Sequence, residues 1–89
     1  MFKVKYDIRV KDDIENIPKK AQKRIKAAIE NKLETQPDIF GKPLRRSLKG
    51  FRSLRVGVYR VVFLIEKKTV LVLAIAHRKD IYEMALKRK

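Results

Sequence analysis

The chain has 89 residues, of which 45% are hydrophobic, so we expect one small domain over residues 1–89 with a single core. It contains no cysteine, which excludes a disulfide framework and a thiolate metal site. Lysine and arginine number 24 against 10 acidic residues. The resulting formal net charge of +14 favours an anionic partner: a nucleic acid, an anionic membrane surface or an acidic protein.

The N-terminal part of the chain predicts one strand followed by two helices. Residues 2–10 alternate between apolar and polar side chains, which is typical of a half-buried strand. Asp12 and Glu15 resemble a capping pair, so we expect a short helix to begin there and to end at Pro18. A second helix follows, because its apolar residues recur every three or four positions. The members of that stripe are Ala21, Ile25, Ala28, Ile29 and Leu33.

The C-terminal part predicts three strands and a last helix. Residues 38–50 contain two glycines and a proline and indicate a loop with a turn of helix. Strands are expected over 51–56, 58–66 and 69–77, with a turn at Gly57, and a terminal helix over 78–88. The order of elements predicts an α+β fold. We expect a small antiparallel β-sheet, made of the N-terminal strand and the three-strand meander, with the two N-terminal helices packed on one face and a short C-terminal helix.

The face of this sheet opposite the helices would be free to carry basic residues. Between Asp38 and Glu66 the chain has no acidic residue and seven basic ones. Arginine favours planar, bidentate contacts with phosphate, whereas the scattered lysines of residues 19–32 are equally well explained as a solvated surface. The basic residues of the stretch are Lys42, Arg45, Arg46, Lys49, Arg52, Arg55 and Arg60. The sequence therefore predicts a surface that binds a nucleic acid or an acidic partner.

Several chemistries are excluded by the residues that the chain lacks. There is no glycine-rich phosphate loop, no paired-carboxylate signature and no Ser/His/Asp signature. Cleavage of RNA by its own 2′-hydroxyl needs only alignment, charge stabilisation and two proton transfers. Arginines stabilise charge but are poor bases, so His77 and Tyr82 are the candidates for proton transfer. The remaining cationic candidates are Arg52, Arg55, Arg60 and Arg78.

Each candidate also has a structural interpretation. Tyr82 would be a core or rim aromatic, and His77 a histidine satisfied at a strand end. Arg60 would point to a solvated face of the sheet. Arg52 and Arg55 lie three residues apart, so on a regular strand they face opposite sides of the sheet.

Two segments, LKGFRSLRVGVYRVVFLI and VLVLAIAHRKDIYEMAL, resemble the RelE/ParE superfamily of toxins from prokaryotic toxin–antitoxin pairs. The resemblance is carried by a G-x-Y-R motif at Gly57–Arg60 and an HR-x-D-x-Y motif at His77–Tyr82. The order of the preceding strand and helices also matches, so the likeness covers nearly the whole chain. It implies a compact α+β toxin of the cytoplasm with no membrane partner, metal or cofactor, held inactive by an acidic RelB-like antitoxin.

The RelE branch of this superfamily cleaves mRNA on the ribosome by 2′-hydroxyl attack. Carried over by motif, Arg60 would bind the scissile phosphate, Arg78 would stabilise charge or aid the leaving group, and Tyr82 would stack on or orient a base. His77 is the substitute candidate for the general base, because the basic pair of that branch is represented here by Arg52 and Arg55. The resemblance leaves two alternatives open: a ParE-like toxin that inhibits gyrase, and a non-catalytic basic module that binds nucleic acid.

Overall fold

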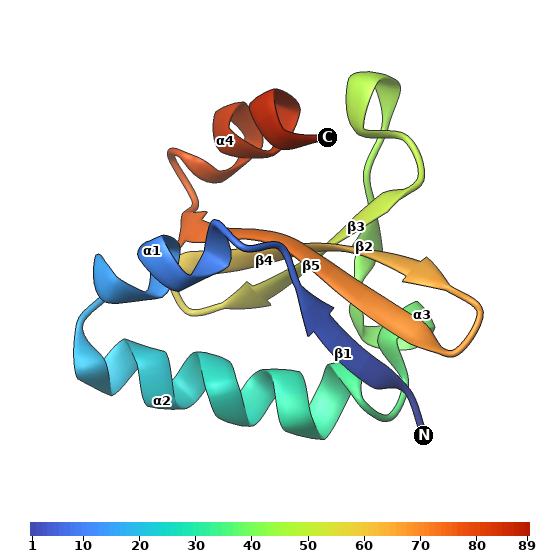
Figure 1. Cartoon of the computed structure of the whole chain (residues 1–89), viewed down its shortest axis with the longest axis horizontal. Coiled ribbons are helices and arrows are strands. Elements are labelled where there is room, and N and C mark those ends of the chain that lie inside the picture. The colour runs from blue at the N-terminus through green and yellow to red at the C-terminus, as the bar shows by residue number, and fades with distance from the viewer.

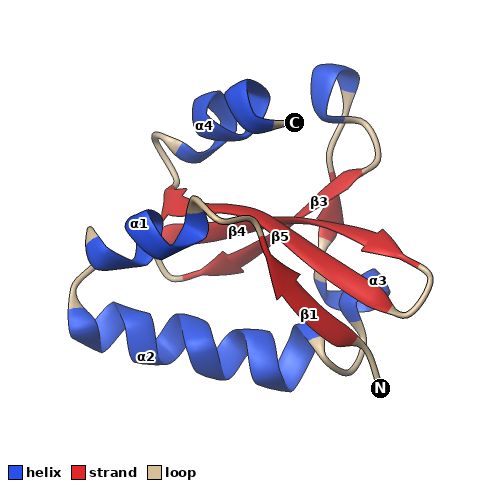
Figure 2. Cartoon of the chain, viewed as in Figure 1, coloured by secondary structure: helices blue, strands red, loops and turns tan.

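The computed structural model describes all 89 residues, and Figures 1 and 2 show how its helices and strands are arranged. In chain order they are β1 (Lys3–Tyr6), α1 (Val10–Glu15), α2 (Lys19–Ala28), the π-helical turn η1 (Ile29–Leu33), α3 (Pro37–Phe40), β2 (Lys42–Pro43), the 3-10 turn η2 (Arg46–Leu48), β3 (Phe51–Val56), β4 (Tyr59–Glu66), β5 (Thr69–His77) and α4 (Ile81–Arg88).

The five strands form one mixed sheet in the order β1-β5-β4-β3-β2. The meander β3-β4-β5 is antiparallel as predicted, but β1 runs parallel to β5, so the expectation of an antiparallel sheet is wrong for this edge. Alternating hydrophobicity identifies a strand but carries no information on the direction of its neighbour. The predicted N-terminal strand is also too long: it ends at Tyr6, and Ile8 is almost fully exposed.

The helices follow the predicted order with shifted ends. Helix α1 begins at Val10 rather than at Asp12, which lies within its first turn and caps nothing. A carboxylate there still interacts favourably with the positive end of the helix. The apolar stripe of α2 is confirmed, since Ile25, Ile29 and Leu33 are buried, with the last two in the π-helical turn. No helix has the length and apolarity needed to cross a bilayer.

A large core lies between the sheet and the two N-terminal helices. Eleven buried side chains form it, all of them branched aliphatic or aromatic. The ring of Phe63 and the side chains of Val61, Val70 and Val72 are completely buried in its centre. In Figure 1, α2 runs below the sheet along this face. The core members are Val10, Ile17, Ile25, Ile29, Leu33, Leu54, Val61, Phe63, Val70, Val72 and Ile75.

The opposite face carries a second, smaller core under α4. The expectation that this face is free is therefore wrong, because α4 returns over β4 and β5 above the sheet (Figure 1). Three of the seven buried residues of this core are alanines. The small side chains let the helix approach the strands closely. The members are Leu48, Val62, Leu73, Ala74, Ala76, Ile81 and Ala85.

A β-bulge in β5 changes which side chains face which core. Val62 pairs with Ala74 and Phe63 with Val72, so Leu73 is an extra residue on β5. Before the bulge, Val72 faces the large core; after it, Ile75 does. The alternation of the strand is thus inverted over its last residues.

The two turns of the meander both use backbone with positive φ. Gly57 opens the β3–β4 turn with φ 62°, the conformation that glycine adopts without strain. Lys67 opens the β4–β5 turn with φ 56°, which is uncommon for a residue with a side chain. The pair Lys67-Lys68 therefore forms a two-residue turn although it contains no glycine or asparagine.

Candidate functional site

The candidate site is built around two arginines that face each other across a strand pair. Arg55 on β3 and Arg60 on β4 are register partners. Both lie on the α4 face, because Leu54, Val61 and Tyr59 on alternate positions pack into the opposite core. Like charges directly opposite one another are unfavourable in a sheet unless an anion lies between them. This pair therefore has the charge and spacing to attract a phosphate or carboxylate.

Arg78 and Tyr82 lie beyond the end of β5 on the same side of the molecule. The Arg78 amide donates a hydrogen bond of 2.8 Å to the Val58 carbonyl, which holds the loop after β5 against the β3–β4 turn. Tyr82 is in the first turn of α4 and is 38% exposed. Arg55, Arg60, Arg78 and Tyr82 thus belong to elements that contact one another at this end of the sheet, and we call these four residues the arginine cluster. It spans two strands, a loop and a helix.

The side chains of the arginine cluster are not engaged in other contacts. None of its three guanidinium groups makes an ion pair or hydrogen bond within the protein, although the chain forms three salt bridges elsewhere. Partnerless guanidinium groups remain available to an incoming anion. No group of three or more histidine, cysteine or acidic side chains gathers to form a metal site.

His77 lies on the other side of the sheet from Arg60. The bulge in β5 places its ring against Tyr59, edge to face, with 6.0 Å between ring centroids. Its Nδ1 accepts a hydrogen bond of 3.1 Å from the Lys79 amide. The contacts of His77 are therefore those of a histidine satisfied at a strand end. The structure does not place it with the arginine cluster.

Arg52 and Arg55 lie on opposite faces of the sheet, as their spacing of three residues predicts. Arg52 faces the large core, where its guanidinium donates to the Asp38 carbonyl at 2.7 Å and the Gly41 carbonyl at 2.6 Å. These bonds tie β3 to α3. The structure thus gives Arg52 a structural role, and it does not lie beside Arg55 as a second RNA-binding residue.

Three further basic residues lie on the loop that carries η2. Arg45, Arg46 and Lys49 are exposed and free of side-chain partners. This loop adjoins the end of α4, where the Lys89 ammonium donates to the Ser47 carbonyl at 2.6 Å. The loop and the arginine cluster lie toward opposite ends of α4.

A buried ion pair that no sequence pattern predicts attaches the end of α4 to α1. Arg88 binds Asp13 of α1 through both guanidinium nitrogens, at 2.7 and 2.8 Å. The side chains are only 13% and 4% exposed. The hydrogen bonds and charge of Asp13 raise the pKa of Arg88 above its ordinary value. Their separation by 75 residues leaves no local pattern by which they could have been found.

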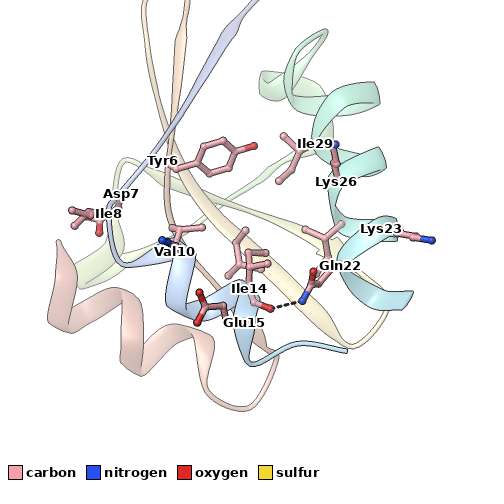
Figure 3. Close-up of a pocket in the computed structure, with 13 residues that line it drawn as sticks. Tyr6, Asp7, Ile8, Val10, Ile14, Glu15, Gln22, Lys23, Lys26 and Ile29 are labelled. Carbon is pink, nitrogen blue, oxygen red and sulfur yellow. Dashed lines mark hydrogen bonds between the residues drawn. The ribbon is translucent and has the colours of Figure 1, made fainter. Parts of the chain in front are cut away.

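The largest groove of the molecule lies away from these groups, between β1, α1 and α2, with a volume of about 730 Å³ (Figure 3). Its floor is aliphatic and its rim includes three lysines, and the Gln22 amide donates to the Ile14 carbonyl at 2.8 Å. Burial, with smaller contributions from Glu34 and Glu30, raises the pKa of Tyr6 at its edge. The lysines are Lys11, Lys23 and Lys26.

Fold and site together define a small basic α+β protein with a cross-strand arginine pair on one face of its sheet. The sequence model of the ParE toxin of type II toxin–antitoxin systems matches residues 4–82. The chain belongs to this family, within the RelE/ParE superfamily of toxins.

Relatives and solved structures agree with this membership. Over 83 residues the chain is 34% identical to Toxin RelG of Mycobacterium tuberculosis, covering 91% of this chain and 95% of the relative. It is 35% identical to Toxin RelE of the same organism over 74 residues, covering 81% and 76%. The RelBE2 toxin–antitoxin complex of M. tuberculosis contains a chain with a TM-score of 0.81 and 31% identity, over 89% of this chain and 93% of that one.

Proposed function

We propose that this toxin is a ribosome-dependent mRNA endonuclease of the cytoplasm. The observation that carries the proposal is the cross-strand pair of exposed Arg55 and half-buried Arg60, whose guanidinium groups have no partner within the protein. The relatives named RelG and RelE support this branch of the superfamily. The whole domain over residues 1–89 would serve this one activity.

The proposed reaction needs no external nucleophile. The 2′-oxygen of a ribose attacks the adjacent phosphorus while the bond to the 5′-oxygen of the next nucleotide breaks. The products are a 2′,3′-cyclic phosphate and a 5′-hydroxyl, and a base and an acid must move one proton each. Arg60 and Arg55 would hold the phosphate and stabilise the extra negative charge, which is the largest contribution that fixed donors make to such a step.

The remaining two members of the cluster would act on the leaving group and the base. Arg78, on the loop after β5, would stabilise the departing 5′-oxygen. Tyr82 would stack on or orient an unpaired base, and its hydroxyl is a group able to exchange a proton. His77 is left out of this assignment because its ring lies against Tyr59 on the far face.

The test is toeprinting on translating ribosomes with wild type, Arg60→Ala and Lys20→Ala. Lys20 is an exposed cation on α2, on the other side of the sheet, and is the matched control. We expect codon-localised cuts with wild type and Lys20→Ala, and a loss of about 100-fold or more in rate with Arg60→Ala. Full toxicity of the Arg60→Ala, Arg78→Ala double variant without any cut in mRNA would refute the proposal.

A second candidate function follows from the name of the family model. The matching family model is named after the ParE toxin. The alternative to mRNA cleavage is therefore inhibition of DNA gyrase by a protein of the same fold. It predicts blocked supercoiling and DNA breaks at toxic doses while mRNA stays intact. Salt-sensitive binding of RNA with neither cleavage nor toxicity would instead indicate a non-catalytic binding module.

We further propose that an acidic RelB-like antitoxin controls the toxin. Solved neighbours include RelB–RelE complexes from Methanococcus jannaschii and Pyrococcus horikoshii. A net charge of +14 would speed the approach of an acidic partner and strengthen its binding. The aliphatic groove with its lysine rim suits an amphipathic acidic segment. Co-expression with a short acidic protein encoded beside the toxin gene should restore growth; continued arrest despite a soluble complex would contradict this.

A further inference from the structure

Helix α4 carries Tyr82, yet only a small apolar surface holds the helix on the sheet. Its buried residues are Ile81 and Ala85, and the strand residues beneath it include Ala74 and Ala76. Hydrophobic stabilisation grows with the apolar area removed from water, so alanines hold a helix weakly. Ile81 fixes the first turn of α4. The last turn needs another attachment.

That attachment is the ion pair of Arg88 with Asp13, together with two backbone groups of β5. The Asp13 carboxylate also accepts a hydrogen bond of 3.1 Å from the Ile75 amide, and Arg88 donates to the Leu73 carbonyl at 3.2 Å. We call this four-part contact the clasp. It joins α1, β5 and the last turn of α4 in one buried network.

The clasp exists because β5 has an unpaired edge at this point. The ladder between β1 and β5 ends at Tyr6 and Val72, so the backbone groups of Leu73 and Ile75 have no strand partner. A buried backbone group without a partner is strongly unfavourable. The carboxylate and the guanidinium each satisfy one of these groups and also each other. The backbone of β5 therefore decides where each charge must lie. An acceptor, the Asp13 carboxylate, must face the Ile75 amide, and a donor, the Arg88 guanidinium, must face the Leu73 carbonyl.

We infer that Asp13 and Arg88 are positioning residues for the toxin's reaction, which hold α4 so that Tyr82 and the adjoining Arg78 loop stand correctly beside Arg55 and Arg60. The inference rests on the proposed function. Tyr82 lies six residues before Arg88, about 9 Å along the helix axis. Loss of the clasp leaves α4 held by the apolar contacts of Ile81 and Ala85 and by exposed hydrogen bonds such as that of Lys89. A displacement of about 1 Å at a reacting group lowers rates by about 100-fold.

Two measurements on four proteins test the inference. The proteins are wild type, Asp13→Asn, Arg88→Lys and Glu83→Gln. Glu83 forms an exposed ion pair with Lys87 on the same helix, at 3.4 Å, so its variant is the matched control. The first measurement is amide hydrogen exchange of α4 and of the β4–β5 pair. The second is single-turnover cleavage of mRNA on programmed ribosomes as a function of toxin concentration.

We expect α4 amides of Asp13→Asn to exchange at least about tenfold faster, with β4–β5 amides nearly unchanged. The maximal cleavage rate should fall about tenfold or more, while the half-saturating toxin concentration changes less than about threefold, because the cations that bind RNA are retained. Arg88→Lys keeps the positive charge but loses the planar, bidentate fork, so it should lie between wild type and Asp13→Asn. Glu83→Gln should match wild type in both measurements.

The outcomes separate this inference from the proposed function. If wild type does not cleave, the endonuclease proposal fails, while the exchange data still decide whether the clasp holds α4. Normal cleavage by Asp13→Asn with a loosened α4 would overturn the positioning role. Loss of protection throughout the sheet in both Asp13→Asn and Arg88→Lys would overturn it too, since the pair would then hold the whole fold. The charge-reversed double variant Asp13→Arg, Arg88→Asp should not recover activity, because Ile75 and Leu73 fix the polarity.

Discussion

The two faces of the sheet are built differently. The face under α1 and α2 buries eleven large side chains with no alanine among them, whereas the face under α4 buries seven residues, three of them alanine. The partnerless arginines Arg55 and Arg60 lie on the second face. The first face therefore provides most of the hydrophobic stability, and the second keeps charged groups exposed that contribute nothing to folding. The separation allows the site to be altered without unfolding the protein.

The difference between the two faces is tested most directly by truncating a buried side chain in each core. Phe63→Ala removes a completely buried ring and should lower the free energy of unfolding by about 3–5 kcal/mol. Leu48→Ala on the α4 face should cost about 2 kcal/mol, at the lower end for buried leucine, since Leu48 lies at the edge of its core. Urea unfolding followed by circular dichroism measures both. Equal losses would show that the faces are equivalent.

Adding a single carbon on the large-core side tests how tightly that face is packed. The position of a Cβ on Gly41 is already occupied by the ring of Phe63 and lies near the Pro37 carbonyl. Gly41→Ala should therefore cost about 2–3 kcal/mol, the upper part of the range for overpacking. The loss should appear as a lower unfolding midpoint for the entire domain. An unchanged midpoint would mean that α3 moves aside freely.

Adding three carbons on the α4 side should have a smaller and more local effect. Ala85 is completely buried against the strands, so Ala85→Leu pushes α4 outward. We expect the free energy of unfolding to fall by about 1 kcal/mol, because α4 can move outward whereas the strands cannot. Hydrogen exchange should show faster α4 amides and unchanged β4 amides. Uniform acceleration over the whole chain would contradict a separately held helix.

The smallest effect is expected at the exposed ion pair near the clasp. Arg9 donates two hydrogen bonds of 2.9 Å to the Asp7 carboxylate, and these bonds hold the pKa of Asp7 well below its ordinary value. A carboxyl whose pKa is lowered by folding stabilises the protein above its unfolded pKa of about 3.9, and that stabilisation is lost as the pH falls further. Asp7→Asn should therefore cost about 0.2–1 kcal/mol at neutral pH, because Arg9 is largely exposed.

The pH dependence of that loss is its control. Below pH ~3.9 the stabilities of wild type and Asp7→Asn should converge, because the unfolded carboxyl takes up a proton while the native carboxyl, held by Arg9, stays ionised. Denaturant midpoints at pH ~7 and pH ~3 measure the two differences. A difference that does not shrink on acidification would show that the hydrogen bonds of Arg9, rather than the charge of Asp7, carry the effect.

The meander could be predicted almost to the residue, because its evidence is local. Strands over 51–56, 59–66 and 69–77 follow from apolar runs interrupted by Gly57 and the lysine pair. The α+β class is confirmed for the same reason. The opposed directions of Arg52 and Arg55 also follow from their spacing. The parallel pairing of β1 lay outside local reasoning, since a strand's own residues do not specify its partner.

The site could be predicted only in part. Arg60, Arg78 and Tyr82 were named from motifs, and the fold gathers them on one side; their roles stay predictions. The choice of His77 rests on its ability to transfer a proton and on the resemblance, and neither reveals the bulge at Leu73, which carries no recognisable residue pattern. The clasp joins residues 75 positions apart and depends on which strand edge is left open. Such contacts are properties of the tertiary structure.

The extra residue in β5 also decides which chemistry the sheet presents. If β5 kept regular alternation through Leu73, the residues from Ala74 onward would exchange sides, so that His77 would turn to the face of Arg60 and Ile75 would turn out of the hydrocarbon interior. Deletion of Leu73, by contrast, would straighten β5 and leave the later residues on their present sides. One extra residue in a strand thus sets the orientation of every residue that follows it.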